Sequence, residues 1–246
     1  MALVETEALV LRTYNLAEAD KIVVCLTRTA GLIRGVARGA RKIKNRIGAA
    51  LEPFTLANIS YYEKETQELV SLRQAEILTS HFDLSGEPET LAGLAYIGDL
   101  VTEFSPPHQA NEKLFRMVKA CLEAIALSAQ DLESILRYFE IWSLKLEGFL
   151  PDLRRCAECR RLFTEDDMVF VGQDLYLRCR SCSQGRGSAL SKMVRSQLRA
   201  TQRLAPYVFA QGSRGVPTRA RREMAELTHQ MIGRVLERQP RVQPAV

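Results

Sequence analysis

The sequence predicts an α+β protein: an N-terminal five-stranded barrel, then a helical C-terminal domain with an inserted four-cysteine ribbon. Three observations carry this prediction. The segment 1–80 is rich in short β-branched runs, apolar residues adopt helical spacing after Ser80, and four cysteines form two Cys-x-x-Cys pairs. We expect a barrel over 1–80, a helical bundle over 81–150, a ribbon over 151–188 and further helices over 189–246, packing on the bundle, with a disordered tail from about residue 239.

Five short runs within 1–80 predict strands, with breakers such as Gly31, Gly48 and Pro53 between some of them. The runs are ALVLRTY, KIVVCLT, GLIRGVA, PFTLANISYY and LVSLRQAEIL. Five strands in a segment of this length suit a small closed barrel, of which the OB-fold is the commonest of that size. An SH3-like barrel is the structural alternative.

Three sets of apolar residues then repeat with the spacing of a helix. Pro88 suits a first helical turn, Asp131 an N-cap and Gly148 a helix end, and Trp142 is expected in the core. Later helices are expected from about Leu190 to Ala205 and from about Thr218 to Glu237. The three sets are Leu91, Leu94, Gly98 and Val101; Leu114, Val118, Cys121 and Ile125; and Leu132, Ile135, Leu136, Phe139 and Leu146.

The net charge of +5 is unevenly distributed. Residues 1–80 hold 11 basic and 9 acidic groups, residues 81–155 hold 7 and 12, and residues 156–246 hold 16 and 8. The two ends are therefore basic and the middle is acidic, which suggests that the ends meet a polyanion. Charge alone leaves RNA, DNA and anionic lipid open.

Four of the six cysteines have the spacing of a zinc site. The pair Cys156 and Cys159 is followed, at the separation of two zinc-ribbon knuckles, by the pair Cys179 and Cys182. Between them, MVFVGQDLYLR can form a hairpin that turns at Gly172–Asp174. A chain without a secretion signal is not expected to form disulfides, and a redox motif needs only one pair. We expect one structural zinc per chain, closed to substrate by its four thiolates. Cys25 and Cys121 lie in apolar settings and are expected to be buried thiols.

The stretch GLIRGVARGARKIKNRIG, from Gly31 to Gly48, holds six cations and no carboxylate. On an extended chain most of these cations share one face, opposite Ile33, Ala37, Ile43 and Ile47. A helix would contain three glycines, so we expect a strand that leads into a basic loop. Single-strand binders follow phosphates with such a face, and Phe54, Tyr61 and Tyr62 are candidate stacking groups, with Phe54 more plausibly buried. The six cations are Arg34, Arg38, Arg41, Lys42, Lys44 and Arg46.

A second basic set lies on one face of the expected helix after residue 190. It consists of Lys192, Arg195, Arg199 and Arg203, opposite Leu190, Val194 and Leu198. This pattern alone is that of an amphipathic helix. Arg219, Arg221 and Arg222 lie near the start of the next helix, where the macrodipole disfavours cations, so phosphate contact is an alternative reason for their presence.

Sequence motifs for catalysis are missing. The chain has no phosphate loop, no His-Glu-x-x-His and no Gly-x-Ser-x-Gly, and its three histidines are scattered. The acidic run Glu165–Asp167 resembles a ligand set, but in a turn it is better explained as a solvated corner. The N-terminus MALVETEALV lacks a basic leader region, and no apolar run approaches the length of a membrane span. We therefore expect a cytoplasmic protein with no membrane contact and no small-molecule substrate.

The order of these parts, with GLIRGVARGARKIKNRIGAALEPFT at its N-terminal end and CAEC…CRSC later, resembles the RecO family of bacterial recombination mediators. The resemblance covers the whole chain. It implies an OB-fold that binds single- and double-stranded DNA, annealing of complementary strands, and action with RecR and the single-stranded-DNA-binding protein in RecA loading, in the cytoplasm and at the nucleoid during repair. The family's DNA-binding role falls on the six cations of Gly31–Gly48, and its zinc role on the four cysteines. Lys192, Arg195 and Arg199 are further candidate DNA-binding residues.

Two other functions stay open at this level. A zinc-ribbon RNA-binding or transcription-associated factor would differ in its relative affinity for RNA and single-stranded DNA. A hydrolase with an unrecognised site would need a metal position open to water, which four thiolate ligands do not leave. We expect a DNA-binding protein that is not an enzyme.

Overall fold

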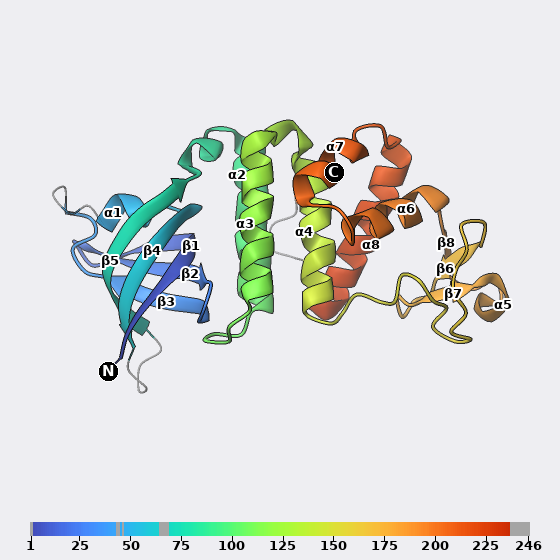
Figure 1. Cartoon of the computed structure of the whole chain (residues 1–246), viewed down its shortest axis with the longest axis horizontal. Coiled ribbons are helices and arrows are strands. Elements are labelled where there is room, and N and C mark those ends of the chain that lie inside the picture. The colour runs from blue at the N-terminus through green and yellow to red at the C-terminus, as the bar shows by residue number, and fades with distance from the viewer. Residues whose placement is uncertain (1, 43–44, 46, 64–68, 237–246) are drawn as a thin grey trace. The chain divides into compact units, whose positions relative to one another are not determined.

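The computed structural model describes residues 2–42, 45, 47–63 and 69–236. The chain divides into two compact units, with the boundary between Leu132 and Glu133. This boundary falls inside the range 81–150 that the sequence analysis treats as one bundle. Strands β1 to β5 and helices α2 and α3 belong to the first unit, and the elements from α4 to α8 make up the second (Figure 1).

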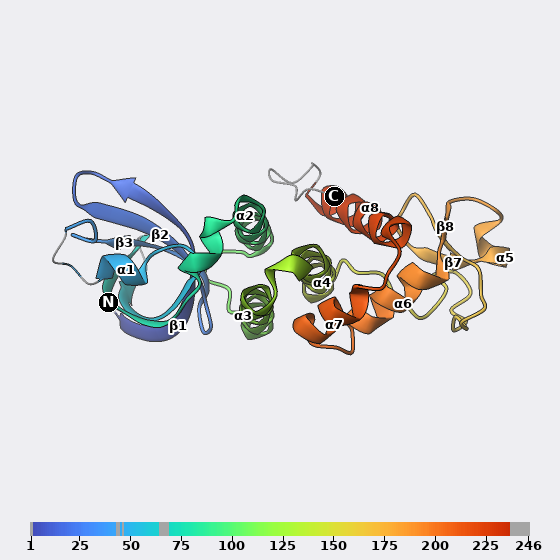
Figure 2. The same ribbon diagram turned by 90° about the horizontal axis from the view of Figure 1, so that it is seen from above.

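The first unit begins with five strands that overlap the five predicted runs, although β1 begins at Ala2, well before its run at Ala8. They are β1 (Ala2–Leu16), β2 (Asp20–Thr27), β3 (Gly31–Ala37), β4 (Thr55–Glu63) and β5 (Leu69–Ser80), with the short helix α1 (Ile47–Ala50) between β3 and β4. The strand order is β1-β2-β3-β5-β4, and β4 pairs again with β1, so the sheet closes on itself (Figure 2). The β3–β5 pair is parallel and the other four pairs are antiparallel. A single long strand, β1, makes the closure possible because its first half pairs with β4 and its second half with β2.

The interior of the sheet is filled by alternate residues of every strand, as a period of two requires. Cys25 is fully buried there, as predicted, and burial raises the pKa of its thiol to about 12. The residues of this core include Ala8, Val10, Val23, Ile33, Ala37, Leu51, Ile59, Tyr61, Val70 and Leu72.

Helices α2 (Pro88–Phe104) and α3 (Glu112–Leu127) complete the first unit, after a short 3-10 helix, η1 (Phe82–Gly86). Pro88 occupies the first turn of α2 as predicted, and Asn111 caps α3 by accepting from the Leu114 amide at 3.0 Å. Cys121 is buried on the apolar face of α3 as expected. Leu91 departs from the predicted apolar set because it is 43% exposed.

The turn at Gly31 joins the sheet to the connection between α2 and α3. Gly31 has φ +68°, and a Cβ at this position would lie 2.0 Å from the carbonyl oxygen of Gln109. The His108 amide donates to the Leu32 carbonyl at 3.0 Å beside it. Only glycine fits both the backbone angle and this close approach.

The second unit is built on α4 (Leu132–Leu146), α6 (Lys192–Thr201), α7 (Pro206–Ser213) and α8 (Thr218–Val235). Gly148, at φ +79°, follows the end of α4, as predicted, and the amides of Phe149 and Leu150 both donate to the Leu144 carbonyl. The Trp142 indole is only half-buried, and it donates to the Thr201 carbonyl at 2.7 Å. Helix α7 is not predicted by the sequence pattern, because its eight residues are too few to display an apolar period.

Between α4 and α6 lies the cysteine segment, with β6 (Val169–Val171), β7 (Leu177–Cys179), the short helix α5 (Arg180–Ser183) and β8 (Ser188–Leu190). Strands β6 and β7 form the expected hairpin, which is closed by a hydrogen bond that the Gly172 amide donates to the Tyr176 carbonyl at 3.1 Å. Strand β8 pairs with the other edge of β6 and was not predicted. Strand β8 ends just before Ser191, which caps α6. The helix therefore begins at Lys192, two residues after the predicted start at Leu190.

Candidate nucleic-acid interface and metal centre

The basic stretch is a strand followed by a turn, as the sequence predicts. Within β3, Ile33 and Ala37 face the core while Arg34 is exposed. After Ala37 the chain turns, and the backbone at Gly39 is held by the carboxylate of Asp20, which accepts from the Gly39 amide at 2.8 Å. The Arg41 amide donates to the Ala19 carbonyl at 2.9 Å. The β1–β2 turn therefore positions the basic turn.

The cations of this stretch have no acidic partner among the described residues. Arg34, Arg38, Arg41 and Lys42 are all exposed. The Arg41 side chain donates from Nη1 to the Ala17 carbonyl at 3.1 Å. The carboxylate of Glu52 forms an ion pair with Lys21 at 2.8 Å. Lys44 and Arg46 lie outside the described residues.

Of the three candidate stacking aromatics, only Tyr62 keeps an exposed surface. Tyr61 is fully buried in the sheet interior and Phe54 is also buried, so neither offers a ring to a nucleotide. Tyr62 is half-buried, and the guanidinium carbon of Arg73 lies 4.9 Å from the centre of its ring. Sequence reasoning missed Arg73, which has no basic neighbour in the chain to draw attention to it.

The basic face of α6 is largely engaged within the protein, which corrects the role expected for Arg195. Arg195 is 6% exposed, and its guanidinium donates to the carbonyls of Asp167 at 2.5 Å and Thr164 at 2.7 Å. Arg199 donates to the Phe163 carbonyl at 3.2 Å, and Lys192 pairs with Asp166 at 2.8 Å. Arg195 has no face left for a phosphate. Lys192 stays exposed, and Arg199 is half-buried.

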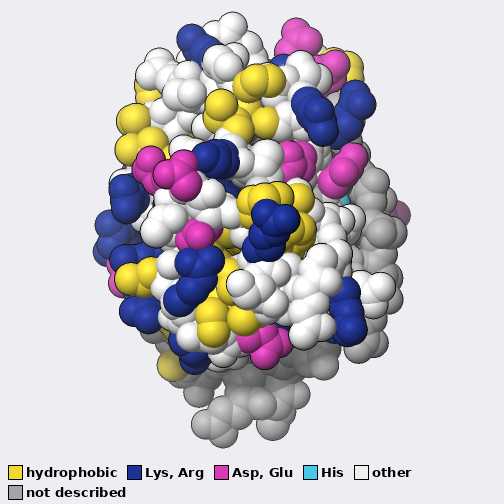
Figure 3. All heavy atoms as spheres, turned by 90° about the vertical axis from the view of Figure 1, so that its right-hand side faces the viewer, with side chains coloured by type: hydrophobic (Ala, Val, Ile, Leu, Met, Phe, Trp, Pro, Cys, Tyr) yellow, Lys and Arg dark blue, Asp and Glu magenta, His cyan; other side chains and the backbone are white. Residues whose placement is uncertain are grey.

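Of the three arginines at the start of α8, one is ion-paired within the protein and two are exposed. Arg221 pairs with Glu133 at 3.2 Å, so it stabilises the packing of α8 within the second unit. Arg219 and Arg222 are exposed and make no ion pair within the part of the chain that the structure describes. On the side that carries β6–β8, cationic side chains alternate with acidic and apolar ones and do not form one continuous patch (Figure 3).

The four cysteines come together as the spacing predicts. Their Sγ atoms all lie within 4.8 Å of one another, and those of Cys159 and Cys179 are 3.9 Å apart. All four are free thiols, and Cys156 and Cys179 are buried. A tetrahedral zinc site with Zn–S bonds of about 2.3 Å requires sulfurs about 3.8 Å apart, so this donor set fits the metal. Among the described residues no other cluster of His, Cys, Asp or Glu has this arrangement, and in the acidic run 165–167 Asp166 pairs with Lys192 and Asp167 with Arg161.

Electrostatics within the cluster shift the pKa values of Cys179 and Cys182 in opposite directions. The pKa of Cys179 is lowered to about 6, first because the Cys182 backbone amide donates to its sulfur and then through the Arg161 guanidinium, while burial opposes the shift. The pKa of Cys182 is raised to about 12, chiefly by its hydrogen bond with Cys179. One sulfur thus takes the negative charge while its neighbour keeps the proton, as expected for thiols in contact.

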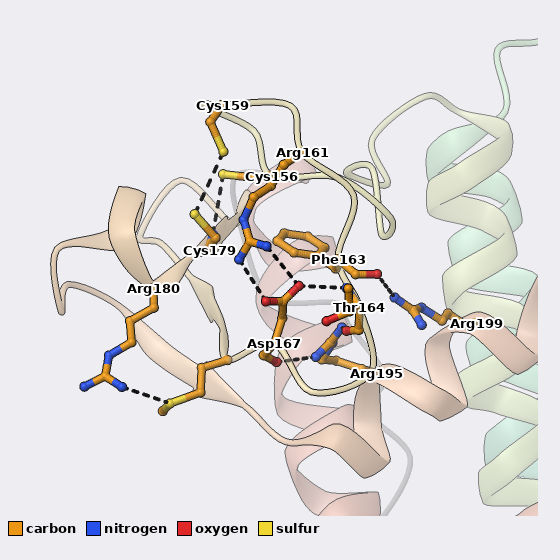
Figure 4. A network of polar contacts seen from close by, with 11 residues as sticks. Cys156, Cys159, Arg161, Phe163, Thr164, Asp167, Cys179, Arg180, Arg195 and Arg199 are labelled. Atoms are coloured by element: carbon orange, nitrogen blue, oxygen red, sulfur yellow. Dashed lines mark hydrogen bonds and ion pairs between the residues drawn. The ribbon is translucent and has the colours of Figure 1, made fainter.

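A network of polar contacts connects the cysteine cluster to α6 (Figure 4). Arg161 follows closely after Cys159 in the chain and donates to both carboxylate oxygens of Asp167. Asp167 also accepts from the Thr164 amide at 2.7 Å, and its own carbonyl accepts from Arg195. Sequence reasoning missed Arg161, although its position beside a cysteine pair is a usable signal for a residue that supports metal ligands.

No helix in the described part of the chain is both long and apolar enough to cross a membrane.

Two family models match the chain. Recombination protein O N terminal covers residues 1–81, and Recombination protein O C terminal covers residues 85–244. The chain belongs to the RecO family.

Curated relatives agree with this assignment. DNA repair protein RecO of Koribacter versatilis (strain Ellin345) is 36% identical over 155 residues, which are 63% of this chain and 63% of that protein. DNA repair protein RecO of Anaeromyxobacter sp. (strain K) is 31% identical over 182 residues, 74% of this chain and 71% of the relative. The protein of the same name from Syntrophus aciditrophicus (strain SB) is 32% identical over 179 residues, which are 72% of this chain and 69% of that protein. The first of these matches spans less than two thirds of the relative. The boundary between the two RecO models, at residues 81–85, is close to the end of β5.

Proposed function

We propose that this RecO-family chain is a non-enzymatic DNA-binding recombination mediator. In this proposal it binds single- and double-stranded DNA through its basic surfaces and anneals complementary strands. Its relatives are named DNA repair proteins, and its family is named for recombination. Action with RecR and the single-stranded-DNA-binding protein in RecA loading, in the cytoplasm and at the nucleoid, is part of the same proposal and rests on the family resemblance.

The main support for the proposal is the cationic surface formed by Arg34 of β3 and the turn that follows this strand. Arg34, Arg38, Arg41 and Lys42 are exposed and have no carboxylate partner among the described residues. Four cations without acidic partners repel one another, and an anionic partner lowers the electrostatic free energy of this repulsion. Regularly charged phosphates are such a partner, and they are contacted without regard to base identity. Screening two strands on one basic surface removes their mutual repulsion and lets complementary bases pair.

We assign the sheet of the first unit to the OB-fold within this proposal. The parallel β3–β5 pair, the use of β1 as partner to both β2 and β4, and the helix between β3 and β4 support that assignment. The basic turn then lies next to the β1–β2 turn, which is among the loops that bind oligonucleotides in OB-folds.

We further propose that Cys156, Cys159, Cys179 and Cys182 hold one structural zinc per chain, in a zinc ribbon formed with β6–β8. When bound, the metal would cross-link the two knuckles and stabilise the fold, and four thiolate ligands leave no position for a substrate. Lys192 and Arg199 remain secondary candidates for DNA contact, since neither is fully buried.

A salt titration tests the main proposal. Each phosphate neutralised on a single strand contributes about −0.7 to the slope of log K against log salt. Replacing Arg38, Arg41 and Lys42 together with Gln should therefore flatten that slope by about 2, to a similar extent for unrelated sequences. The matched control replaces Lys113, Arg116 and Lys119 of α3 with Gln, which changes the net charge equally and should leave the slope unaltered.

Fluorescence anisotropy on a labelled oligonucleotide measures this slope, after both variants show the melting temperature of the parent. An equal effect of the two variants would remove the basic turn from the DNA site. Strand annealing without nucleotide tests the activity itself. Tighter binding to matched RNA than to DNA would favour the alternative, a zinc-ribbon RNA-binding or transcription-associated factor.

A further inference from the structure

The outer face of the five-stranded sheet carries a continuous transverse row of residues. The pairings Tyr14–Ile22, Ile22–Val36, Val36–Ser71 and Ser71–Tyr62 connect one residue of each successive strand. The row therefore begins on the second half of β1 and crosses β2, β3 and β5 to reach β4. With strands about 4.8 Å apart, its two tyrosines lie about 19 Å from each other along the curved sheet.

Burial separates this row from its neighbours. Each of its five residues is exposed or half-buried, and Tyr14 is 51% exposed. In the next row, Ala37, Leu72 and Tyr61 are buried in the interior of the sheet. The row thus combines two aromatic and two aliphatic side chains on a face that the described residues leave open to solvent.

A β-bulge directs a cation onto this row. In the β4–β5 pair, Ser60 pairs with Gln74 and Tyr61 with Leu72, which leaves Arg73 as the extra residue of β5. Bulges re-aim side chains, and here the guanidinium of Arg73 lies over the ring of Tyr62 at 4.9 Å. The guanidinium covers one face of the Tyr62 ring, so a base stacks on the other face or takes the place of the guanidinium, with a cation beside it in both cases.

Two further cations flank the row on β3 and just after it. Arg34 precedes Val36 by the strand period of two and lies on the same face of β3, whereas Arg38 lies in the turn that follows the strand; both arginines are exposed. The row itself contains no carboxylate. Aromatic faces bordered by cations are what single-strand binders offer to bases and phosphates together.

We propose that this row is a contact site for unpaired bases, with Tyr62 and Tyr14 as stacking groups and Arg73, Arg34 and Arg38 at the phosphates. This rests on the proposed DNA-binding function and adds a means of discrimination. A duplex keeps its base faces stacked within the helix, so only a single strand can use the tyrosines. The cations alone serve both forms.

The test compares single-stranded and duplex DNA of equal length on the full chain. Tyr62→Ala should weaken single-strand binding by about 5- to 150-fold, the effect of losing one base–aromatic stack, and should leave duplex binding unchanged. Tyr62→Phe keeps the ring face and should bind as the parent does. Tyr176→Ala, which removes an exposed tyrosine of the second unit, is the matched control and should change neither affinity.

A second measurement needs no variant. Ultraviolet cross-linking to a 5-iododeoxyuridine oligonucleotide, with peptide mapping, should place adducts on Tyr62 or Tyr14. Adducts confined to other residues, or equal losses of single-strand and duplex binding in a folded Tyr62→Ala variant, would overturn the stacking site alone. Failure of the parent chain to bind either form would instead overturn the proposed function.

Discussion

The guanidinium of Arg161 donates to both carboxylate oxygens of Asp167, over 2.9 and 3.2 Å. This pair lowers the pKa of Asp167 to about 2 and holds Arg161 where it also lowers the pKa of Cys179. A cation beside a thiolate ligand offsets part of the negative charge of a four-thiolate site. The Arg161–Asp167 pair would thus support the proposed zinc site.

Arg161→Gln should weaken zinc binding by about 10- to 100-fold, the range found for residues that orient metal ligands. Competition with a chromophoric chelator measures the affinity. Arg160→Gln is the control, because Arg160 is exposed next to the same cysteine pair and its side chain makes no ion pair among the described residues. Equal affinities for the two variants would show that Arg161 does not support the site.

Removing a ligand should have a larger effect. Cys179→Ser is expected to lose the single bound zinc and to loosen the segment 150–190, because metal binding at such sites is also folding free energy. Elemental analysis of the purified chain gives the stoichiometry, and hydrogen exchange reports the loosened segment. Cys25→Ser, in the interior of the other unit, controls for loss of a buried thiol and should keep the metal. Parent protein without stoichiometric zinc would refute this prediction.

Arg195 is expected to stabilise the second unit through its hydrogen bonds to loop carbonyls. Arg195→Gln removes two charge-assisted hydrogen bonds to carbonyls and should lower the free energy of unfolding of the second unit by about 2 kcal/mol. Arg203→Gln removes an exposed cation just past the end of the same helix and should cost little. Chemical denaturation separates the two. A stable Arg195→Gln variant with a flatter salt slope for DNA binding would instead assign Arg195 to phosphate contact.

The second unit should lose stability in acid through Glu140. This carboxylate is fully buried; burial alone would raise its pKa, but the charge of Arg137, the hydrogen bond from His229 and that from Thr228 bring the pKa below its ordinary value of 4.5. Because the folded pKa is the lower one, the stabilisation is complete above about pH 4.5 and is lost as pH falls through the folded pKa.

Glu140→Gln should remove this part of the acid dependence and, by leaving Arg137 unpaired, destabilise the unit at neutral pH by about 3 kcal/mol or more. Glu226→Gln, exposed on α8, is the control. Unfolding free energies measured at neutral pH give the loss of stability, and those measured as the pH falls below the ordinary carboxyl pKa give the acid dependence. An acid dependence identical in Glu140→Gln and the parent would contradict the assignment.

The sequence by itself determined the elements whose signal is local. The five β-branched runs correspond to β1–β5, the three apolar repeats to α2, α3 and α4, and the two later helical ranges to α6 and α8, because strand and helix periods are set by a residue's near neighbours. The cysteine cluster followed from two short spacings and one hairpin. The outward phase of Arg34 followed from alternation within β3.

Tertiary structure decided which of those side chains remain available. Arg195 has the sequence context of an exposed cation, yet carbonyls from the loop that precedes β6 enclose it. Tyr61 and Tyr62 are adjacent in sequence, and only the direction of sheet closure sends the first inward and leaves the second at the surface. Arg73 reaches Tyr62 through a bulge that exists only in the β4–β5 pairing. Each outcome depends on contacts between segments distant in sequence, and local periodicity contains no information about those contacts.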